Sequence, residues 1–560
     1  MKTSTKRFFA GILMFSLLVG DVFLARPAGG SAAEASPKDA EAKATNIRKG
    51  SVTVDGDQIR TENVNGLTFK GFGLLSGNST SDLLMDYKAE NPQAYARLMQ
   101  YLFGGEYPIM NHVKLEMGND RNNSTGPESA TKRSREEAAN VRRNPGWQLA
   151  ADAKKINPGI KVSILRWNQP AWVKTDEDIY TWYKETILQA YETYGFMVDY
   201  INPNINERWR GKTDVAFTKK FAGWIAAETE QTIPDDTARG LFQKIKLIVS
   251  DEAGTVSSAV SEQLKADEDF FNAVSVVGYH YSPYDDANGG MTWLAEQMDK
   301  EVWNSEAQAT FSNSAFRPSN NMKSPSVAGT GIGGAGSCLE MGNTFIKGFV
   351  KSRRSHVIYQ PAIGSFYEGG QYSFKELVSA RDPWSGFIHY DAGLLVLAHL
   401  SKFAKTGWEN EQNTAGIWRA IPEACKSAAA GTNPVDGRNG GENYMTLASP
   451  EKDHFSTVIV NDSEYEMQYD ITVKNMNIGE QNGLHVWETR AAGENAPFNE
   501  NYMKYTGAAA AAEEDGTYAV TVKPYSIVTV TTLDVSGSEE HTAPLFSLRR
   551  SCHPADRGFP

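Results

Sequence analysis

From residue 67 to residue 404, short apolar runs alternate with longer amphipathic stretches, and this alternation narrows the fold more than any other feature of the chain. Runs of strand length separated by segments of helix length are typical of β–α units, which build parallel sheets. Eight such units follow one another, and eight parallel strands with their helices close a (β/α)8 barrel. The runs are FKGFGLLSG (69–77), HVKLEMGND (112–120), IKVSILRWNQP (160–170), FMVDYINPNINE (196–207), KIKLIVSDEA (244–253), AVSVVGYHYSP (273–283), EVWNSEA (301–307) and SHVIYQPAI (355–363).

An open, doubly wound sheet is the alternative arrangement for alternating strands and helices. A Gly-rich phosphate loop directly after a strand would favour it. The Gly-rich stretch GTGIGGAGS (329–337) instead lies between the seventh and eighth runs and is predicted to be a loop. The sequence therefore predicts an α/β fold with a (β/α)8 TIM barrel over residues 67–404.

The pattern changes after residue 405. Short alternating runs separated by turn residues, such as FSTVIVND and GTYAVTVKP, predict an antiparallel β-sandwich over residues 405–535. Residues 50–66 contain two further short runs, SVTVDG and IRTENVNG, which we expect to form N-terminal strands that join the sandwich. The tail, residues 536–560, has no periodicity and is predicted to be disordered.

The first 35 residues read as a signal peptide. Lys2, Lys6 and Arg7 precede the apolar core FFAGILMFSLLVG, and small residues follow, with cleavage expected after Ala33 or Ala35. A retained anchor is the alternative, but the apolar core is short for a membrane span. Residues 36–49 are predicted to be a flexible leader. We expect a secreted or extracytoplasmic protein without stable membrane insertion, because no later segment is apolar enough to cross a bilayer.

Charge and cysteine content exclude several functional classes. The formal net charge is −12 and no basic stripe stands out, so nucleic acid is not an expected partner and a neutral ligand fits better. The three cysteines, Cys338, Cys425 and Cys552, are too few for a disulfide scaffold. A Cys338–Cys425 bridge and three unpaired thiols both remain open. The nine histidines show no HExxH spacing, so neither a metal nor a cofactor is predicted.

Two glutamates stand where barrel chemistry takes place. Glu207 ends the fourth run and Glu306 ends the seventh, and catalytic residues of such barrels lie at the carboxyl ends of the strands. In retaining glycosidases, two carboxyl groups face each other across about 5 Å. The alternative is that they are solvated or cap helices, as is expected for most of the other acidic residues at run ends, Asp120, Asp251 and Glu252.

Neighbouring residues fit a sugar site. Asn206 can donate its amide to a sugar hydroxyl, and Trp167 ends the third run, where its ring can stack on a sugar. His280 and Tyr281 end the sixth run, next to the seventh in a barrel, and a tyrosine hydroxyl there can orient the Glu306 carboxylate and keep it ionised. The alternatives are that the tryptophan packs in the core and that His280 is a satisfied buried imidazole.

At these residues the chain resembles glycoside hydrolase family 59, the galactocerebrosidases, within clan A of the barrel glycosidases. The resemblance rests on KLEMGND, RWNQPAW, NER, VSDE, VVGYHY, WNSEA, GAGSC and the long DPWSGFIHYDAGLLVLAHLSKFAKTGW. It implies retaining hydrolysis of a terminal β-D-galactoside, with Glu207 as acid/base and Glu306 as nucleophile. Asn206 and Trp167 match sugar-binding positions of the family.

The chain also departs from the family pattern. Ile205 stands where the family usually has Trp before the Asn-Glu pair. Tyr359 replaces a tryptophan expected to contact sugar after the eighth strand, and Asn123 or Ser124 takes the place of a family threonine.

These departures leave three hypotheses. The first is a β-galactosidase acting on galactosylceramide-like galactolipids or galactosylated glycans. The second is a family 30-like endo-β-galactanase or glucosylceramidase. The third is a non-catalytic carbohydrate-binding protein, against which the two intact glutamates argue.

Overall fold

The computed structural model describes residues 47–77, 80–121, 128–208, 213–253, 257–281, 288–307, 338–364, 376–390, 392–430, 437–479, 483–490, 503–512 and 516–541. The chain divides into two compact units, residues 1–45 and 46–560, and every described residue belongs to the second. The predicted signal peptide (1–35), residues 36–46 of the predicted leader, Asn123, Ser124 and Cys552 lie outside the described residues.

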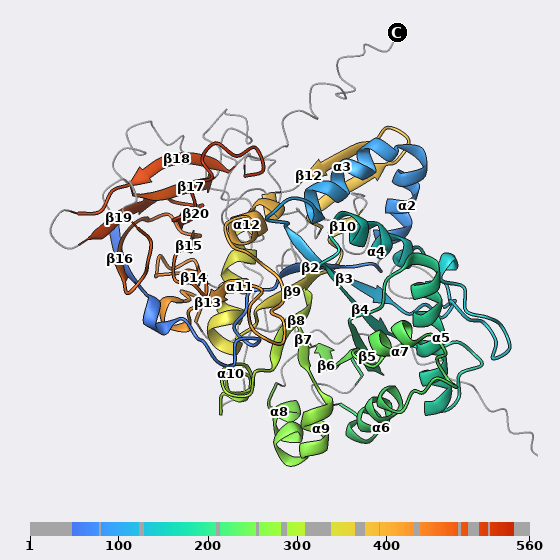
Figure 1. Cartoon of the computed structure of the whole chain (residues 1–560). Helices are drawn as coiled ribbons and strands as arrows, with labels where there is room; N and C mark the ends of the chain where they lie inside the picture. Colours follow the sequence, from blue (N-terminus) through green and yellow to red (C-terminus); the bar gives the residue numbers. More distant parts are fainter. Residues whose placement is uncertain are drawn as a thin grey trace, which may run out of the picture. The chain divides into compact units, whose positions relative to one another are not determined.

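Eight parallel strands close into a barrel, and Figure 1 shows them at the centre of the barrel helices. The last strand pairs with the first, so that Gly71 lies opposite His356 and the sheet has no free edge. Seven strands fall within the apolar runs and β3 overlaps the second run, beginning two residues before it, which confirms the barrel. The strands are β2 (Gly71–Leu75), β3 (Met110–Glu116), β4 (Lys161–Arg166), β5 (Tyr200–Ile205), β6 (Lys246–Ala253), β7 (Val276–His280), β8 (Glu301–Ala307) and β9 (His356–Tyr359).

Helices separate the barrel strands. In the longest, Thr175 caps the N-terminus and forms a capping box with Asp178, while Gly195 ends the helix in a left-handed conformation with φ of 76°. The helices are α2 (Thr80–Glu90), α3 (Pro92–Phe103), α4 (Pro145–Ile156), α5 (Asp176–Tyr194), α6 (Val215–Ala226), α7 (Asp236–Phe242), α8 (Ser257–Ala266), α9 (Glu268–Ala273), α10 (Gly290–Glu296), α11 (Leu339–Ser352) and α12 (Ala392–Ser401). None of the helices in the described ranges is long and apolar enough to cross a membrane.

Side chains fill the barrel interior in layers. An apolar cluster draws one residue from each of seven strands: Leu75, Leu165, Tyr200, Ile248, Val276, Trp303 and Ile358. Polar side chains complete the layers, and the alternate residues His112, Lys114 and Glu116 of β3 are all buried. Because alternate residues of a strand share a face, Lys114 and Glu116 lie progressively closer to the carboxyl end of the barrel than His112.

The C-terminal region forms two sheets that share an apolar core, as predicted for a sandwich. The six-stranded sheet has the order β13 (Arg419–Ala420), β14 (Tyr444–Ala448), β15 (Phe455–Asn461), β20 (Ser526–Thr531), β17 (Leu484–Arg490) and β18 (Lys504–Ala509). The three-stranded sheet has the order β1 (Ile47–Asp55), β16 (Glu466–Lys474) and β19 (Thr517–Val522). All neighbours run antiparallel except β1, which pairs in parallel with β16.

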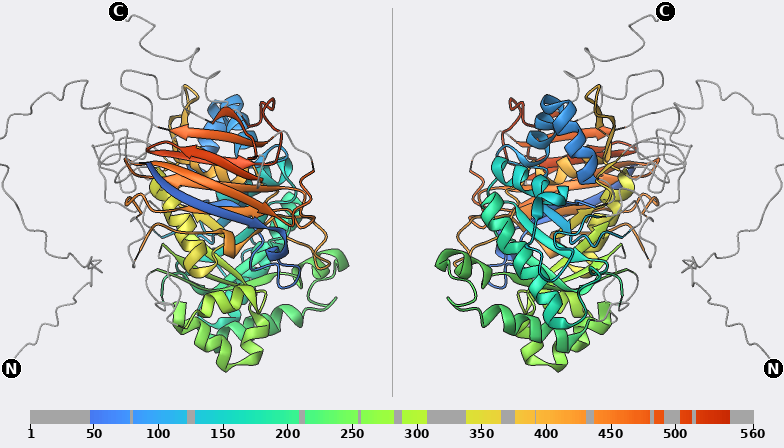
Figure 2. Two further views of the ribbon diagram at one scale, coloured as in Figure 1. Left: turned by 90° about the vertical axis from the view of Figure 1, so that its left-hand side faces the viewer. Right: turned by 90° about the vertical axis from the view of Figure 1, so that its right-hand side faces the viewer.

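The N-terminal segment supplies one strand to this region, not the two that the sequence pattern predicts. In Figure 2, strand β1, in blue, lies among the orange and red strands of the C-terminal sheets. It begins at Ile47, inside the segment predicted as leader, because its pairing with β16 starts with Ile47 opposite Glu466. Val52 and Val54 alternate into the shared core. Residues 59–66 form no strand; a short 3-10 helix (Gly56–Gln58) and turns carry the chain to the barrel.

One detail is not expected from the sequence, and one alternative that the sequence leaves open is decided. A small sheet of β10 (Ile363–Gly364), β11 (Val378–Asp382) and β12 (Phe387–Tyr390) stands between the last barrel strand and α12. Cys425 carries a free thiol, so no Cys338–Cys425 bridge forms. Its Sγ donates a hydrogen bond to the carbonyl of Ile421 at 3.1 Å.

Candidate active site

The barrel brings Glu207 and Glu306 together at the carboxyl ends of β5 and β8. A carboxylate oxygen of each and a ring nitrogen of His280 all lie within 4.8 Å of one another. Glu306 is buried, with 3% of its surface exposed, whereas Glu207 is half-buried. Residues from three strands therefore form one compact cluster, which we call the carboxyl cluster.

The backbone at Glu207 is held in an unusual conformation. Its φ is 55°, in the left-handed region, which costs a non-glycine residue about 1–3 kcal/mol. Hydrogen bonds fix the turn from both sides. The amide of Glu207 donates to the carbonyl of Asp251 at 3.2 Å, and the amide of Asn206 donates to the carbonyl of Arg166 at 2.9 Å. The two neighbouring strands, β4 and β6, thus hold the carboxyl group in place.

His280 connects the cluster to a buried acid. Its Nδ1 lies 2.7 Å from Glu207 Oε1 and 3.7 Å from Glu306 Oε2, and its Nε2 lies 2.9 Å from Asp251 Oδ1. Burial lowers the pKa of the imidazole, but the charge of Glu306 and the bonds to Asp251 and Glu207 outweigh this and raise the pKa to about 10. His280 is therefore an imidazolium at neutral pH and donates from both nitrogens.

Asp251 is the negatively charged partner of His280. Lys114 Nζ lies 2.8 Å from Asp251 Oδ1 and 3.0 Å from Oδ2, and Asn202 Nδ2 donates to Oδ2 at 3.1 Å. Burial raises the pKa of Asp251, but Lys114 and His280 outweigh it and hold the pKa well below its ordinary value. Asp251 thus stays ionised and keeps the imidazolium oriented.

Glu306 receives two donors on one oxygen. Tyr281 donates its hydroxyl to Oε1 at 2.5 Å, and Gln360 donates its amide to the same oxygen at 2.8 Å. Gln360 also donates to the Tyr281 hydroxyl at 3.2 Å. Oε2 has no hydrogen-bond partner among the described residues. Burial and the charge of Glu207 raise the pKa of Glu306, so that the two carboxyls disfavour simultaneous ionisation.

Asn206 and Trp167 lie beside the cluster. Asn206 is 3% exposed, and neither its amide oxygen nor its amide nitrogen finds a partner in the described structure. A buried amide with both atoms unpaired is rare unless a ligand completes it. Trp167 packs against the apolar cluster of the barrel interior and donates its Nε1 to Glu116 Oε1 at 3.2 Å.

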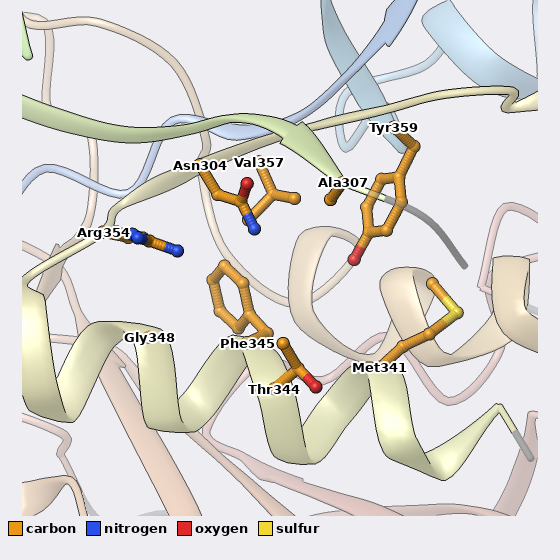
Figure 3. A pocket seen from close by; sticks show the side chains of 9 residues that line it. All are labelled: Asn304, Ala307, Met341, Thr344, Phe345, Gly348, Arg354, Val357 and Tyr359. Atoms are coloured by element: carbon orange, nitrogen blue, oxygen red, sulfur yellow. The ribbon is translucent and has the colours of Figure 1, made fainter. Parts of the chain in front are cut away.

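The structure does not place Tyr359 with the carboxyl cluster. Figure 3 shows its ring between the barrel strands and α11, beside Thr344 and Met341, around a cavity of about 10 Å³. Its strand neighbour Ile358 faces the barrel interior, so the alternation of the strand turns Tyr359 outward. The predicted sugar contact by Tyr359 is thereby corrected. Asn123 and Ser124 lie outside the described residues.

Sequence reasoning missed four members of the site. Gln360 is the first residue after the last barrel strand, and Glu116 is the last residue of β3, so the strand-end rule could have found both. The sequence marks Asp251 only as an acidic residue at a run end. Lys114 gave no signal, because a lysine in a strand is ordinarily exposed.

The carboxyl cluster offers three ligand atoms, but its donor set does not suit a metal ion. Both nitrogens of His280 are occupied by hydrogen bonds to carboxylates, and an imidazolium has no lone pair to give. The chemistry available is proton transfer and nucleophilic attack by carboxyl groups.

Comparisons with known proteins find similar sequences and similar folds. The model of Glycosyl hydrolase family 59 matches residues 69–402. Galactocerebrosidase of Danio rerio is 27% identical over 360 residues, covering 61% of this chain and 46% of that protein. Galactocerebrosidase of Homo sapiens is 26% identical over 358 residues, covering 61% of this chain and 44% of that protein. The matched region thus spans less than half the length of these curated relatives.

Solved structures share the architecture. SrfJ from Salmonella typhimurium matches with a TM-score of 0.56 at 13% identity, covering 86% of this chain and 92% of that one. The glycoside hydrolase family 30 subfamily 8 xylanase Xyn30A from Clostridium acetobutylicum matches with a TM-score of 0.51 at 14% identity, covering 86% and 99%. At such identities the likeness shows the fold alone. The family model, in contrast, spans more than half of the chain, and the chain belongs to glycosyl hydrolase family 59.

Proposed function

We propose that the chain is a retaining glycoside hydrolase that removes terminal β-D-galactosyl residues by double displacement. The observation that carries the proposal is the separation of the two glutamates, whose nearest carboxylate oxygens lie within 4.8 Å. Retaining glycosidases hold their carboxyls about 5–5.5 Å apart, whereas inverting enzymes need roughly 6.5–9.5 Å to admit a water molecule.

Glu306 is the proposed nucleophile. Tyr281 and Gln360 donate to Oε1, and these bonds favour the carboxylate form, which leaves Oε2 to attack the anomeric carbon. As the new bond forms, the glycosidic bond breaks. The proton of Glu207 passes to the departing oxygen, so the aglycone leaves as an alcohol.

Glu207 then acts as the base. It takes a proton from water, the hydroxide oxygen attacks the anomeric carbon, and the ester bond to Glu306 breaks, which frees the sugar and restores both carboxyls. During this half-reaction Glu306 is a neutral ester and Glu207 carries the negative charge. The imidazolium of His280, at 2.7 Å, stabilises that charge without becoming a competing proton acceptor.

Support for galactose as the sugar comes from the names of the relatives, which are galactocerebrosidases. The unpaired amide of Asn206 and the Trp167 ring at the end of β4 fit a sugar ligand of any kind. We propose galactosylceramide-like galactolipids or galactosylated glycans as substrates. We also propose export after removal of residues 1–35, on the basis of the basic start and apolar core of that segment. The N-terminal residue of the protein recovered outside the cytoplasm tests this.

A family 30-like endo-β-galactanase or glucosylceramidase is the second candidate, favoured by one observation. Ile205 precedes the Asn-Glu pair where family 59 usually has Trp, so the aromatic ring of the family is missing at this position. Turnover of aryl β-D-glucosides or internal cleavage of galactan, with aryl β-D-galactosides left intact, would favour this candidate.

The test compares variants on an aryl β-D-galactoside with a good leaving group. Glu306→Gln is expected to lose turnover, and Glu207→Ala is expected to regain it with azide, forming a β-galactosyl azide of retained configuration. Glu262→Gln, an exposed glutamate on α8, serves as the matched control. An α-configured sugar as the first product of the wild-type chain would refute double displacement. Glycan binding without hydrolysis of any glycoside would leave a carbohydrate-binding protein.

A further inference from the structure

A large pocket lies at the amino-terminal end of the barrel, opposite the carboxyl cluster. It has a volume of about 780 Å³, in the range of roughly 300–1,000 Å³ typical of pockets for small ligands. Its lining residues come from the first residues of strands β4, β5 and β6 and from helices α4, α5 and α7. Figure 1 labels these strands and helices. Tyr200, the first residue of β5, lines the pocket, and Glu207 follows seven residues later, so the two sites lie roughly 20 Å apart.

The pocket is basic in an acidic protein. Three carboxylates line it, Asp199, Glu409 and Glu411, and two of them are already engaged. Asp199 Oδ1 lies 3.1 Å from Lys161 Nζ and its Oδ2 lies 3.5 Å from Lys154 Nζ, while Glu409 pairs with Arg419 at 3.4 Å. The lining lysines are Lys154, Lys155, Lys161, Lys244 and Lys246.

Positive charge in the pocket is therefore incompletely balanced. Lys161 and Lys154 share one carboxylate, and neither Lys244 nor Lys246 has a carboxylate partner within the described ranges. Burial lowers the pKa of Lys154, the charge of Asp199 opposes this, and the charge of Lys161 lowers the pKa further by a smaller amount. An anion entering the pocket would add a counter-charge beside these lysines.

Aromatic rings give the pocket a rigid floor. Trp408 donates Nε1 to Glu301 Oε2 at 3.0 Å, and Tyr200 donates its hydroxyl to Glu301 Oε1 at 3.1 Å. Because Glu301 is buried at the base of β8, both rings are anchored from inside the barrel. Lys161 Nζ lies 5.9 Å from the Trp408 ring centre, and Lys246 Nζ lies 5.8 Å from the Tyr200 ring centre.

We propose that this pocket binds an acidic oligosaccharide, in which a carboxylate or sulfate group pairs with Lys161 and Lys246 and a sugar ring lies against the half-buried ring of Trp408. Ammonium groups supply the charge pairing, and the fixed Trp408 ring supplies a flat apolar surface suited to a sugar face. A free inorganic anion would use the lysines alone and would leave most of the pocket volume empty. The site is separate from the proposed catalytic centre and does not depend on the reaction proposed there.

Binding is measured by calorimetry with the full chain carrying Glu306→Gln, so that no substrate is turned over. The probes are trigalacturonate, a sulfated galactan disaccharide, neutral galactotriose and inorganic sulfate. We expect trigalacturonate and the sulfated disaccharide to bind, and the tighter of the two shows whether the pocket prefers a carboxylate or a sulfate. Neutral galactotriose and inorganic sulfate should bind at least about tenfold more weakly. Raised salt should weaken binding, because ion pairs at a half-open pocket are screened.

Two kinds of variant locate the binding. Lys161→Gln with Lys246→Gln should lower the affinity about tenfold or more, because the charge-assisted hydrogen bonds to the anion are lost. Lys219→Gln with Lys265→Gln removes the same charge elsewhere and should have no effect. Leu241→Glu places a negative charge at the pocket rim, where the side chain is 39% exposed, and should also weaken binding. Met298→Glu, at 37% exposure outside the pocket, is its matched control.

The proposal is overturned if neither acidic sugar binds, if both pocket variants bind as well as their controls, or if inorganic sulfate binds as tightly as the acidic sugars. Melting temperatures of all variants show whether a loss of binding reflects unfolding. All binding measurements use the Glu306→Gln variant, so they do not depend on galactosidase activity. Failure of this proposal and failure of the proposed function are therefore distinguishable.

Discussion

His280 Nδ1 lies 2.7 Å from Glu207 Oε1, and this contact links the proposed acid/base to a buried charge chain that runs through Asp251 to Lys114. With Glu306 included, the site contains two cations, His280 and Lys114. They face three carboxyl groups, those of Glu207, Glu306 and Asp251. The site is neutral when one of those carboxyls is protonated. A buried cluster avoids a net charge, so the arrangement favours one proton on the glutamate pair, as an acid catalyst and a carboxylate nucleophile require.

Replacing Asp251 by Asn should break the series of charge contacts that runs from His280 to Lys114. Lys114 would keep its charge in the barrel interior without its counter-ion, which destabilises a fold by about 3–5 kcal/mol. Urea unfolding of Asp251→Asn measures the loss, and Asp236→Asn, with a side chain 85% exposed, is the control. A free energy of unfolding equal to that of the wild type would show that the Lys114–Asp251 pair contributes no stability.

Stability should fall with rising pH because of His280. Its pKa is raised from 6.5 when unfolded to about 10 when folded. The folded state therefore binds the extra proton between these values, so the contribution is complete below pH 6.5 and disappears as pH rises through 10. Urea midpoints at pH 6.5 and pH 9.5 should differ more for the wild type than for His280→Gln. His485→Gln, on β17, should behave as the wild type; equal slopes for all three would contradict the assignment.

Gln360 should support the proposed nucleophile. Gln360→Ala removes one donor to Glu306 Oε1, and a hydrogen bond to a charged group is worth about 1.5–3 kcal/mol, or roughly 10- to 100-fold in kcat. Tyr281→Phe removes the other donor and should act in the same direction. Loss of either donor should also raise the pKa of the nucleophile and move the acidic limb of the kcat/KM profile upward. An unchanged profile in both variants would argue against this role.

Tyr359 and Trp167 should give opposite results. Tyr359→Phe removes a hydroxyl that faces α11, and we expect kcat and KM on an aryl β-D-galactoside to stay within twofold of wild type, about 0.4 kcal/mol. Trp167→Ala removes a ring at the edge of the site and should raise KM. A large activity loss in Tyr359→Phe, at unchanged melting temperature, would restore Tyr359 to the sugar site.

Glu128 should limit stability at alkaline pH. Burial and the nearby Glu116 raise its pKa to about 9, and its Oε1 has no partner among the described residues. A carboxyl whose folded pKa is raised from 4.5 stabilises the fold fully only below pH 4.5, and that contribution decreases until pH 9. Glu128→Gln should therefore raise the melting temperature at pH 8 and have a smaller effect at pH 5. A drop at pH 8 would mean that the carboxylate form is the one the fold uses.

The sequence alone determined the barrel, the sandwich and the places of Glu207 and Glu306. The reason is local: apolar runs of strand length recur eight times, and the strand-end rule then assigns the last residues of each run to one face. The same rule extends to Asn206, Trp167 and Tyr281. The residue types at the strand ends could therefore be identified from the sequence before the pairing of the strands was known.

Only the tertiary structure decided which side chains meet. The role of His280 depends on contacts to residues 73 and 29 positions away, and these distances follow from barrel closure rather than from any local pattern. Tyr359 shows a second limit of sequence reasoning, which concerns the direction of a single side chain. One step along β9 separates an inward side chain from an outward one, and the sequence does not give the phase of so short a strand. The basic pocket at the opposite end likewise arises only because three strands and three helices bring separate lysines to one place.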